Sequence, residues 1–306
     1  MGKIDDIQAY KEWTEYHRSL KRDKAADNLS PVERKKKLEK LEANVIEWIL
    51  FFFSEFAKYP FTKFHKKAIK RITTNMEWYE VLSWSRELAK STIVFMCMMY
   101  LVLTGKKRNV LLISNSHENA VRLLEPYKKA FESNSMLKAY YGDLREFGSW
   151  TADEFTLNTG ATFRAIGALE SPRGTRKDAV RPDTALVDDF DTDADCRNPD
   201  ILKKKWEWFE EALFPTRSIS EDLLVIFCGN LIALDCCVKR AGEKADHWDI
   251  VNIRDKEGKS NWPVKKRIAK VLKWEKKAKL SAIVGEKETI REDEKCETIE
   301  IIEKDA

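Results

Sequence analysis

The octapeptide Ser85-Arg86-Glu87-Leu88-Ala89-Lys90-Ser91-Thr92 carries the strongest structural signal in this chain. An apolar run ends just before it at Trp84, and a long apolar stretch with helical character begins just after it at Ile93. A strand, a turn with Lys-Ser and a helix are the layout of a phosphate-binding loop. Free backbone N–H groups at the helix start can bind phosphate oxygens, Lys90 adds a positive charge, and the Ser91 hydroxyl can coordinate Mg²⁺.

The octapeptide departs from the usual phosphate-loop pattern, G-x-x-x-x-G-K-[ST], at both glycine places. Trp84 and Ala89 stand there. A Lys-Ser pair at a helix start is also common at solvated surfaces, so this stretch needs support from a second element.

That support comes from Thr184-Ala185-Leu186-Val187-Asp188-Asp189, an apolar run that ends in two carboxylates. Continuous apolar sequence is typical of a buried parallel strand, and ligands bind at the carboxyl ends of such strands. One acid there can hold Mg²⁺ and the next can orient or activate water. Asp191 extends the acidic cluster. A plain turn after an edge strand is the alternative, because Asp favours turns. The order of the two elements favours nucleoside-triphosphate hydrolysis.

The composition is that of an ordinary globular protein and identifies no partner. Apolar residues make up 43% and charged residues 35%, but the net charge is only +4, so charge alone does not predict nucleic-acid binding. The six cysteines form no C-x-x-C pair and the four histidines are scattered, which argues against a zinc site. The apolar run 48–56 is about half the length of a membrane span, so we predict a buried helix and no membrane partner.

Strands and helices are predicted to alternate in the middle of the chain, which favours a mostly parallel sheet. Four apolar runs are typical of its buried strands: 81–84, 109–114, 184–187 and 222–227. Segments 154–157 and 162–166 predict an inserted hairpin. A helix is predicted over 31–56 with Ser30 as N-cap, and another over 200–213.

Four stretches together resemble the ATPase part of the terminase large subunits of tailed bacteriophages. The first is the octapeptide, with its early Arg and without its first glycine. The others are the polar turn within 113–120, the Arg-Gly element within 171–174, and Phe227-Cys228-Gly229-Asn230 at the end of an apolar run. The resemblance covers roughly residues 59–263, and the order and spacing of the stretches carry it.

The resemblance implies an α/β P-loop ATPase of the additional-strand class, with a mostly parallel central sheet flanked by helices and ATP and Mg²⁺ as cofactors. Lys90 and Ser91 would bind phosphate and Mg²⁺. Arg86 would contact the γ-phosphate and act in catalysis. Asp188 would hold Mg²⁺, and Asp189 takes the place of the catalytic carboxylate.

The resemblance also implies roles outside the phosphate loop. Gly229 and Asn230 would couple the nucleotide state to the grip on DNA, and Arg173 is a possible site residue. The adenine contact has no clear match, since His65 or its neighbours stand in that place. The implied partners are double-stranded DNA, a portal protein, a small terminase subunit and further copies of this chain, in a ring on the procapsid in the host cell cytoplasm.

Three segments are predicted: a helical N-terminal segment at 1–58, the ATPase domain at 59–263, and a charged tail at 264–306 that is first basic and then acidic. Terminase large subunits continue into a nuclease domain, and about forty residues follow here, so we expect no DNA cleavage by this polypeptide. The catalytic acid is usually Glu, and Asp189 is one methylene shorter. Two other functions stay open: a DNA-stimulated ATPase of helicase type, and a non-catalytic nucleotide-binding regulatory module.

Overall fold

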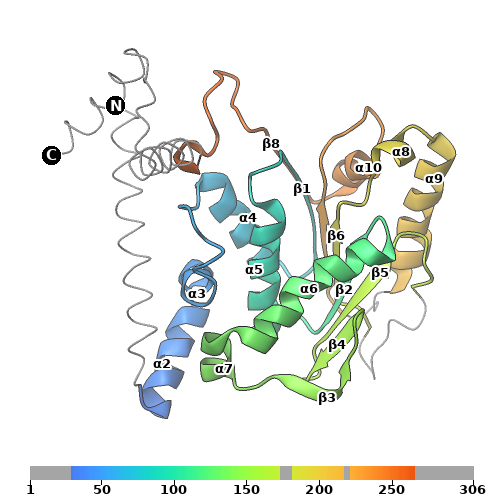
Figure 1. The fold of residues 1–306 in the computed structure, drawn as a ribbon. Coiled ribbons are helices and arrows are strands. Elements are labelled where there is room, and N and C mark those ends of the chain that lie inside the picture. Colours follow the sequence, from blue (N-terminus) through green and yellow to red (C-terminus); the bar gives the residue numbers. More distant parts are fainter. Residues whose placement is uncertain (1–28, 173–180, 217–220, 266–306) are drawn as a thin grey trace, which may run out of the picture. The chain divides into compact units, whose positions relative to one another are not determined.

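The computed structural model describes residues 29–172, 181–216 and 221–265, and an eight-stranded sheet forms its centre (Figure 1). The strands are β1 (Trp78–Trp84), β2 (Asn109–Ser114), β3 (Arg145–Trp150), β4 (Glu154–Leu157), β5 (Thr162–Gly167), β6 (Thr184–Asp188), β7 (Leu224–Cys228) and β8 (His247–Val251). The helices are α2 (Pro31–Glu42), α3 (Val45–Phe52), α4 (Lys63–Thr74), α5 (Lys90–Leu103), α6 (His117–Ser133), α7 (Ser135–Tyr141), α8 (Asp193–Cys196), α9 (Pro199–Glu207), the π-helical η1 (Trp208–Leu213), the 3-10 turn η2 (Phe214–Thr216) and α10 (Cys237–Lys244). Arg173 and the predicted tail from residue 266 onward lie outside the described residues.

The strands lie in the order β3-β4-β5-β2-β6-β7-β1-β8. In this order, the neighbouring strands in the part β5-β2-β6-β7-β1-β8 are parallel. Strand β4 pairs antiparallel with β3 and with β5. An additional strand, β7, separates β1, which precedes the octapeptide, from β6, which ends in Asp188. The predicted fold class, a mostly parallel sheet of the additional-strand type with an inserted antiparallel hairpin, is confirmed.

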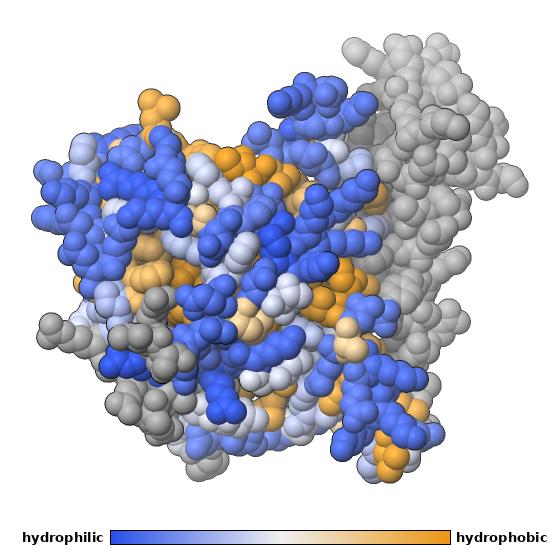
Figure 2. Space-filling model, turned by 180° about the vertical axis from the view of Figure 1, so that it is seen from behind, coloured by the Kyte–Doolittle hydropathy of each residue, from blue (hydrophilic) through white to orange (hydrophobic). Residues whose placement is uncertain are grey.

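Helices cover both faces of the sheet because its central strands are apolar on both sides. In β2, Val110 and Leu112 face the layer of α3 to α7, and Leu111 and Ile113 face α9, η1 and α10. This alternation follows from the two-residue period of a strand. Away from the core, hydrophilic side chains cover much of the face shown in Figure 2.

The helix predicted over 31–56 is wrong in one respect, because two helices occupy this segment. Ser30 and Glu33 form the capping box at the start of α2. Asn44 then leaves the helical conformation, with φ −130° and ψ 96°, and its side chain accepts hydrogen bonds from Ile46 N and Glu47 N. Asn is among the best N-cap residues, so a new helix starts there.

The helix predicted over 200–213 also changes character. It begins as α9 at Pro199 and continues from Trp208 as the π-helical segment η1. A π-helical turn holds one residue more per hydrogen-bonded ring than an α-helix, so it changes which side chains face the sheet.

The described residues through Trp262 form one compact unit, and the chain divides after Trp262. Within the first unit, α3 packs against α4 and α5. The segment boundaries predicted at residues 58 and 263 stay predictions. Across the described ranges 29–172, 181–216 and 221–265, no helix combines the length and apolar character needed to cross a bilayer.

Lys107 is a buried lysine at the amino ends of the strands. Its side chain is 2% exposed, and its ammonium donates hydrogen bonds to the carbonyl oxygens of Met76 (2.9 Å), Asp183 (3.1 Å) and Asp222 (2.8 Å). These carbonyls belong to the segments that lead into β1, β6 and β7. Burial lowers the pKa of Lys107, against the raising effect of Asp183 and the other acids nearby.

We expect Lys107→Met to lower the free energy of unfolding by about 3 kcal/mol, because the carbonyls of Met76 and Asp222 lose the ammonium as a donor and Asp183 O keeps only the backbone N of Leu224. Urea denaturation followed by tryptophan fluorescence would measure the loss. Lys66→Met, at an exposed position of α4, is the control and should change the stability by less than about 0.5 kcal/mol. A loss of similar size in both variants would contradict the role assigned to Lys107.

Candidate functional site

Three turns with polar side chains follow three neighbouring strands. The candidate phosphate loop (residues 85–92) follows β1, the acid turn (residues 188–191) follows β6, and the coupling turn (Gly229 and Asn230) follows β7 between them. Parallel strands end at the same edge of a sheet, and ligands bind there in open α/β folds. The predicted site residues on these three turns therefore lie at one edge.

The backbone of the candidate phosphate loop is strained at the place of the missing glycine. Ala89 is the N-cap of α5 and has a left-handed conformation, with φ 60° and ψ 28°. Glu87 also has a positive φ of 74°. Alanine adopts this conformation at a cost that glycine does not have. The loop thus keeps the backbone shape of a glycine position without the glycine.

His65 forms a hydrogen bond with the backbone of the candidate phosphate loop, a role that the sequence did not predict. Its side chain is buried, and Nε2 lies 2.9 Å from the carbonyl oxygen of Leu88. A carbonyl only accepts, so Nε2 carries the proton. Nδ1 then accepts hydrogen bonds from the backbone N and the hydroxyl of Thr62, the N-cap of α4. No sequence motif marked this residue; only its position before β1 pointed to it.

Lys90 and Asn230 come together across the site. Lys90 Nζ donates to Asn230 Oδ1 over 3.4 Å, and the lysine is 9% exposed at the start of α5. The coupling turn is closely packed behind this contact: Gly229 N donates to Leu82 O, and a Cβ at Gly229 would lie 2.8 Å from Val238 Cγ2. The structure therefore joins the predicted phosphate-binding lysine to the predicted coupling residue.

Ser91 and Asp188 also meet. Ser91 Oγ donates to Asp188 Oδ2 over 2.5 Å. In β6, the side chain of Asp188 lies on the same face as Leu186, the face that α5 covers. Asp188 is 6% exposed, and burial raises the pKa of its carboxyl to about 6; the Asp189 charge adds to this, while the Ser91 hydrogen bond and Lys90 oppose it.

The pair fits a divalent cation that is held mainly by a nucleotide. Mg²⁺ in such sites is bound by one or two protein oxygens, substrate phosphates and water. Ser91 and Asp188 supply one hydroxyl and one carboxylate. In the part of the chain that the structure describes, no group of three or more His, Cys, Asp or Glu could hold a metal ion. These two residues would hold Mg²⁺ only together with phosphate oxygens.

The other residues of the acid turn point in different directions. Asp189 is exposed and has a left-handed φ of 48°, and its backbone N donates to Asp188 Oδ1. Asp191 faces away, because its carboxylate accepts from Cys237 N (3.0 Å) and Val238 N (2.9 Å) at the start of α10. Of the predicted acidic cluster, Asp191 therefore caps a helix, and Asp189 is the free carboxylate beside Asp188.

Arg86 lies on the surface of the candidate phosphate loop. No hydrogen bond or ion pair joins it to Lys90, Ser91, Asp188 or any other described residue. The structure thus places an exposed guanidinium, unpaired among the described residues, next to the predicted phosphate site.

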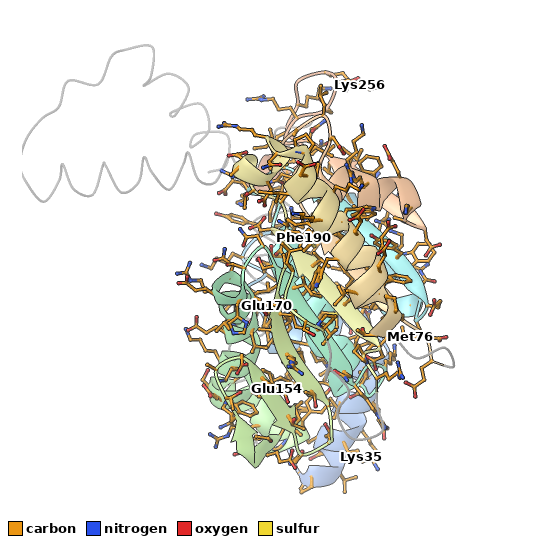
Figure 3. All side chains as sticks on the ribbon, turned by 90° about the vertical axis from the view of Figure 1, so that its right-hand side faces the viewer. Lys35, Met76, Glu154, Glu170, Phe190 and Lys256 are labelled. Atoms are coloured by element: carbon orange, nitrogen blue, oxygen red, sulfur yellow. The ribbon has the colours of Figure 1, made fainter. Side chains whose placement is uncertain are left out.

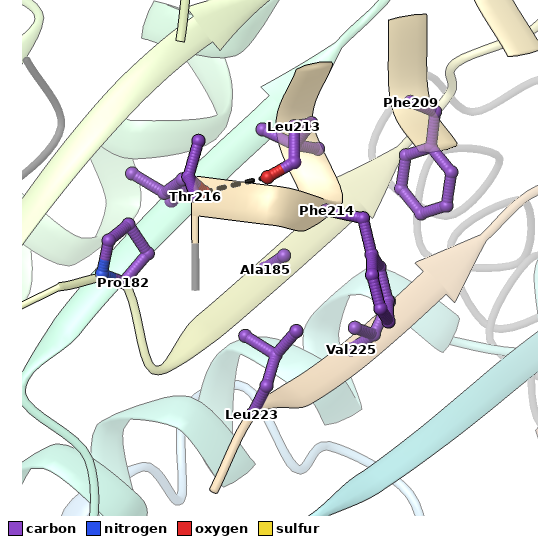
Figure 4. Close-up of a pocket in the computed structure, with 9 residues that line it drawn as sticks. Pro182, Ala185, Phe209, Leu213, Phe214, Thr216, Leu223 and Val225 are labelled. Atoms are coloured by element: carbon purple, nitrogen blue, oxygen red, sulfur yellow. Dashed lines mark hydrogen bonds between the residues drawn. The ribbon is translucent and has the colours of Figure 1, made fainter. Parts of the chain in front are cut away.

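Two hollows lie elsewhere on the described chain. The first, about 10 Å³, is apolar and lies at the amino ends of β6 and β7 against η1 and η2 (Figure 4). It has room for no more than a water molecule. The second, about 470 Å³, runs between α4 and the edge strand β8, where Arg71 forms ion pairs with Glu80 (2.6 Å) and Asp249 (2.8 Å). None of the predicted site residues lines either hollow.

The raised pKa of Asp188 predicts that this residue lowers the stability of the nucleotide-free protein, and that the effect depends on pH. A carboxyl whose folded-state pKa lies above its ordinary 3.8 stabilises the fold most at low pH, and this stabilisation is lost as the pH rises through about 6. We expect Asp188→Asn to raise the free energy of unfolding by about 3 kcal/mol at pH 7.5 and by about half as much at pH 5. Urea denaturation in EDTA would measure both. An equal gain at the two pH values would contradict the prediction.

The strand order and the strand–loop–helix unit define an α/β protein of the additional-strand P-loop class. Neither a protein-family model nor a curated protein matches the sequence. The HK97 bacteriophage large terminase is similar in structure, with a TM-score of 0.47 and 14% identity over 71% of this chain and 44% of that chain. The Thermus phage P74-26 large terminase ATPase domain has a TM-score of 0.40 and 16% identity over 66% of this chain and 83% of that chain; a mutant of it has 0.44 and 14% over 72% and 88%. This chain thus spans less than half of the HK97 protein. Large terminases are the family that the motifs resemble.

Proposed function

We propose that this chain binds Mg²⁺-ATP at the candidate phosphate loop and hydrolyses it. One observation carries the proposal: two independent contacts, Lys90 with Asn230 and Ser91 with Asp188, join the three strand ends at one edge of the sheet. A helix start with a lysine, a hydroxyl and a buried carboxylate is the set of groups that phosphoryl transfer needs.

The residues would divide the work as follows. The N–H groups at the start of α5 and Lys90 bind the phosphates, and Ser91 with Asp188 holds Mg²⁺, which neutralises phosphate charge when bound. Asp189 is exposed next to Asp188 and orients or deprotonates the attacking water. Arg86 contacts the γ-phosphate. Asn230 reports the state of the phosphate through its contact with Lys90.

We further propose that hydrolysis drives double-stranded DNA into a viral procapsid. The sequence motifs support this proposal. From the octapeptide to the coupling turn, they follow one another in the same order as in the terminase large subunits. The partners would be DNA, a portal protein, a small terminase subunit and further copies of this chain, in the host cell cytoplasm.

Three results of one experiment separate the proposal from its alternatives. ATP binding and phosphate release are measured with the purified chain alone, with double-stranded DNA and with single-stranded DNA. Turnover stimulated by double-stranded DNA without strand separation supports a packaging motor. Strand separation on a forked duplex would indicate a helicase-type ATPase instead. Binding of ATP without phosphate release in all three conditions would indicate a non-catalytic regulatory module.

A further inference from the structure

Lys205 lies directly behind the acid turn. Its side chain is 3% exposed, its ammonium donates a hydrogen bond to the carbonyl oxygen of Phe190, and it forms an ion pair with Asp195 over 2.8 Å. Phe190 follows Asp189 in the chain. A buried cation on α9 therefore binds the backbone one residue beyond the proposed catalytic carboxylate.

The side chain of Phe190 is also held in place by residues of this segment. Lys205 at the end of α9 and Trp208 and Phe209 at the start of η1 all lie against the Phe190 ring. The Lys205 ammonium lies 4.5 Å from the centre of the Phe190 ring, Trp208 stacks on this ring at 6.1 Å, and Phe209 lies 6.4 Å away. Figure 3 shows Phe190 beside this helix. The ring is fully buried, so Phe190 is fixed through both its side chain and its carbonyl.

This fixation matters because Asp189 has a left-handed backbone. A non-glycine residue with a φ of 48° keeps that conformation only where its neighbours impose it. On one side, Asp188 accepts the hydrogen bond of Asp189 N. On the other side, Lys205 binds Phe190 and the N-terminus of α10 binds Asp191. These contacts determine where the Asp189 carboxylate points.

A lysine at this buried position needs a specific explanation, because removing its charge from water costs free energy that an apolar side chain would not cost. Desolvation of an ion pair commonly costs as much as its attraction returns, and apolar residues of similar size can be equally stable. Burial raises the pKa of Asp195, but the hydrogen bonds from Lys205 and Thr192 and the Lys205 charge lower it overall. The feature that an apolar residue could not supply here is the donor to the Phe190 carbonyl.

We propose that Lys205 is a positioning residue for catalysis: it fixes the acid turn so that the Asp189 carboxylate points at its water. The proposal rests on the proposed function of Asp189. Without the ammonium, the Phe190 carbonyl loses its donor and the left-handed turn relaxes. A displacement of about 1 Å at a catalytic group can cost about a hundredfold in rate. No hydrogen bond or ion pair among the described residues joins Lys205 to Lys90 or Ser91, the groups proposed to bind ATP.

The test compares two buried lysines in the full chain. We expect Lys205→Met to lower kcat about a hundredfold, to leave the affinity for Mg²⁺-ATPγS within about threefold, and to speed hydrogen exchange in residues 188–191. Lys107→Met, which removes a similarly buried lysine at the opposite end of the strands, should lower the melting temperature while kcat and this exchange stay within about threefold of the parent. Lys205→Gln keeps a polar group but is too short for the contact, and it replaces Lys205→Met if that variant does not fold.

Two outcomes would overturn the proposal. A folded Lys205→Met or Lys205→Gln protein with the parent's kcat or with unchanged exchange in 188–191 would show that the turn does not depend on Lys205. An equal loss of kcat in Lys107→Met would show a general effect of lower stability. If the parent chain binds Mg²⁺-ATPγS but releases no phosphate from ATP, the proposed function fails, and the exchange comparison alone decides whether Lys205 fixes the turn.

Discussion

Lys90→Ala is expected to lower ATP hydrolysis by about 10²–10³-fold, because it removes the cation that faces the phosphates at the start of α5. The variant should fold, since Lys90 contacts a polar side chain, Asn230, rather than packing in the core. Loss of Lys90 also removes a charge that lowers the pKa of Asp188, so binding of Mg²⁺ should weaken as well. Phosphate release at saturating ATP and calorimetric titration with Mg²⁺-ATPγS would measure both effects.

Lys66→Ala provides the control for Lys90→Ala, because Lys66 is an exposed lysine of α4 that lies outside the loop. It should hydrolyse ATP like the parent. Turnover at the parent's rate in folded Lys90→Ala protein would refute the assignment of residues 85–92 as the phosphate loop.

Asp189→Asn is expected to keep ATP binding within about threefold and to lose turnover by about 10²–10⁴-fold, because an amide of nearly the same shape cannot accept the proton. This test is informative because the family that the sequence resembles has Glu at this position, and Asp is shorter by one C–C bond, on the order of 1.5 Å. The left-handed backbone of Asp189 changes the direction of the side chain and offers a way to make up for the shorter reach. Single-turnover hydrolysis separates the chemical step from binding.

Asp193→Asn is the matched control, since Asp193 is an exposed carboxylate four residues further along. It should leave both binding and turnover unchanged. If Asp189→Asn hydrolyses ATP like its parent while Asp193→Asn does not, the water is handled by a different acid and the role of Asp189 is wrong.

Local sequence was enough to predict the strands and the candidate phosphate loop. Apolar runs such as 109–114 predicted buried strands because a strand with helices on both sides must be apolar on both faces. The Lys-Ser pair at the start of α5 predicted a phosphate site because the free N–H groups of a helix start are a local property. The predicted helix over 31–56 failed at Asn44, where a capping side chain ended one helix and began the next.

Contacts between distant residues could not be predicted in the same way. The 3.4 Å contact of Lys90 with Asn230 joins residues 140 positions apart, and that of Ser91 with Asp188 joins residues 97 apart. The resemblance to terminases implied that these residues share a site, but the sequence did not show which atoms would meet. That depends on the strand order, which brings the ends of β6, β7 and β1 side by side.

The sequence by itself determined the α/β class, the loop after β1 and the acids after β6, because strand period, helix start and apolar pattern are read from neighbouring residues. Only the tertiary structure decided that Asp191 caps α10 and that Asp189 is left-handed. It alone revealed His65 under Leu88 and Lys205 behind Phe190. A buried cation or imidazole can be placed only when its partners are known, and those partners come from other layers of the fold.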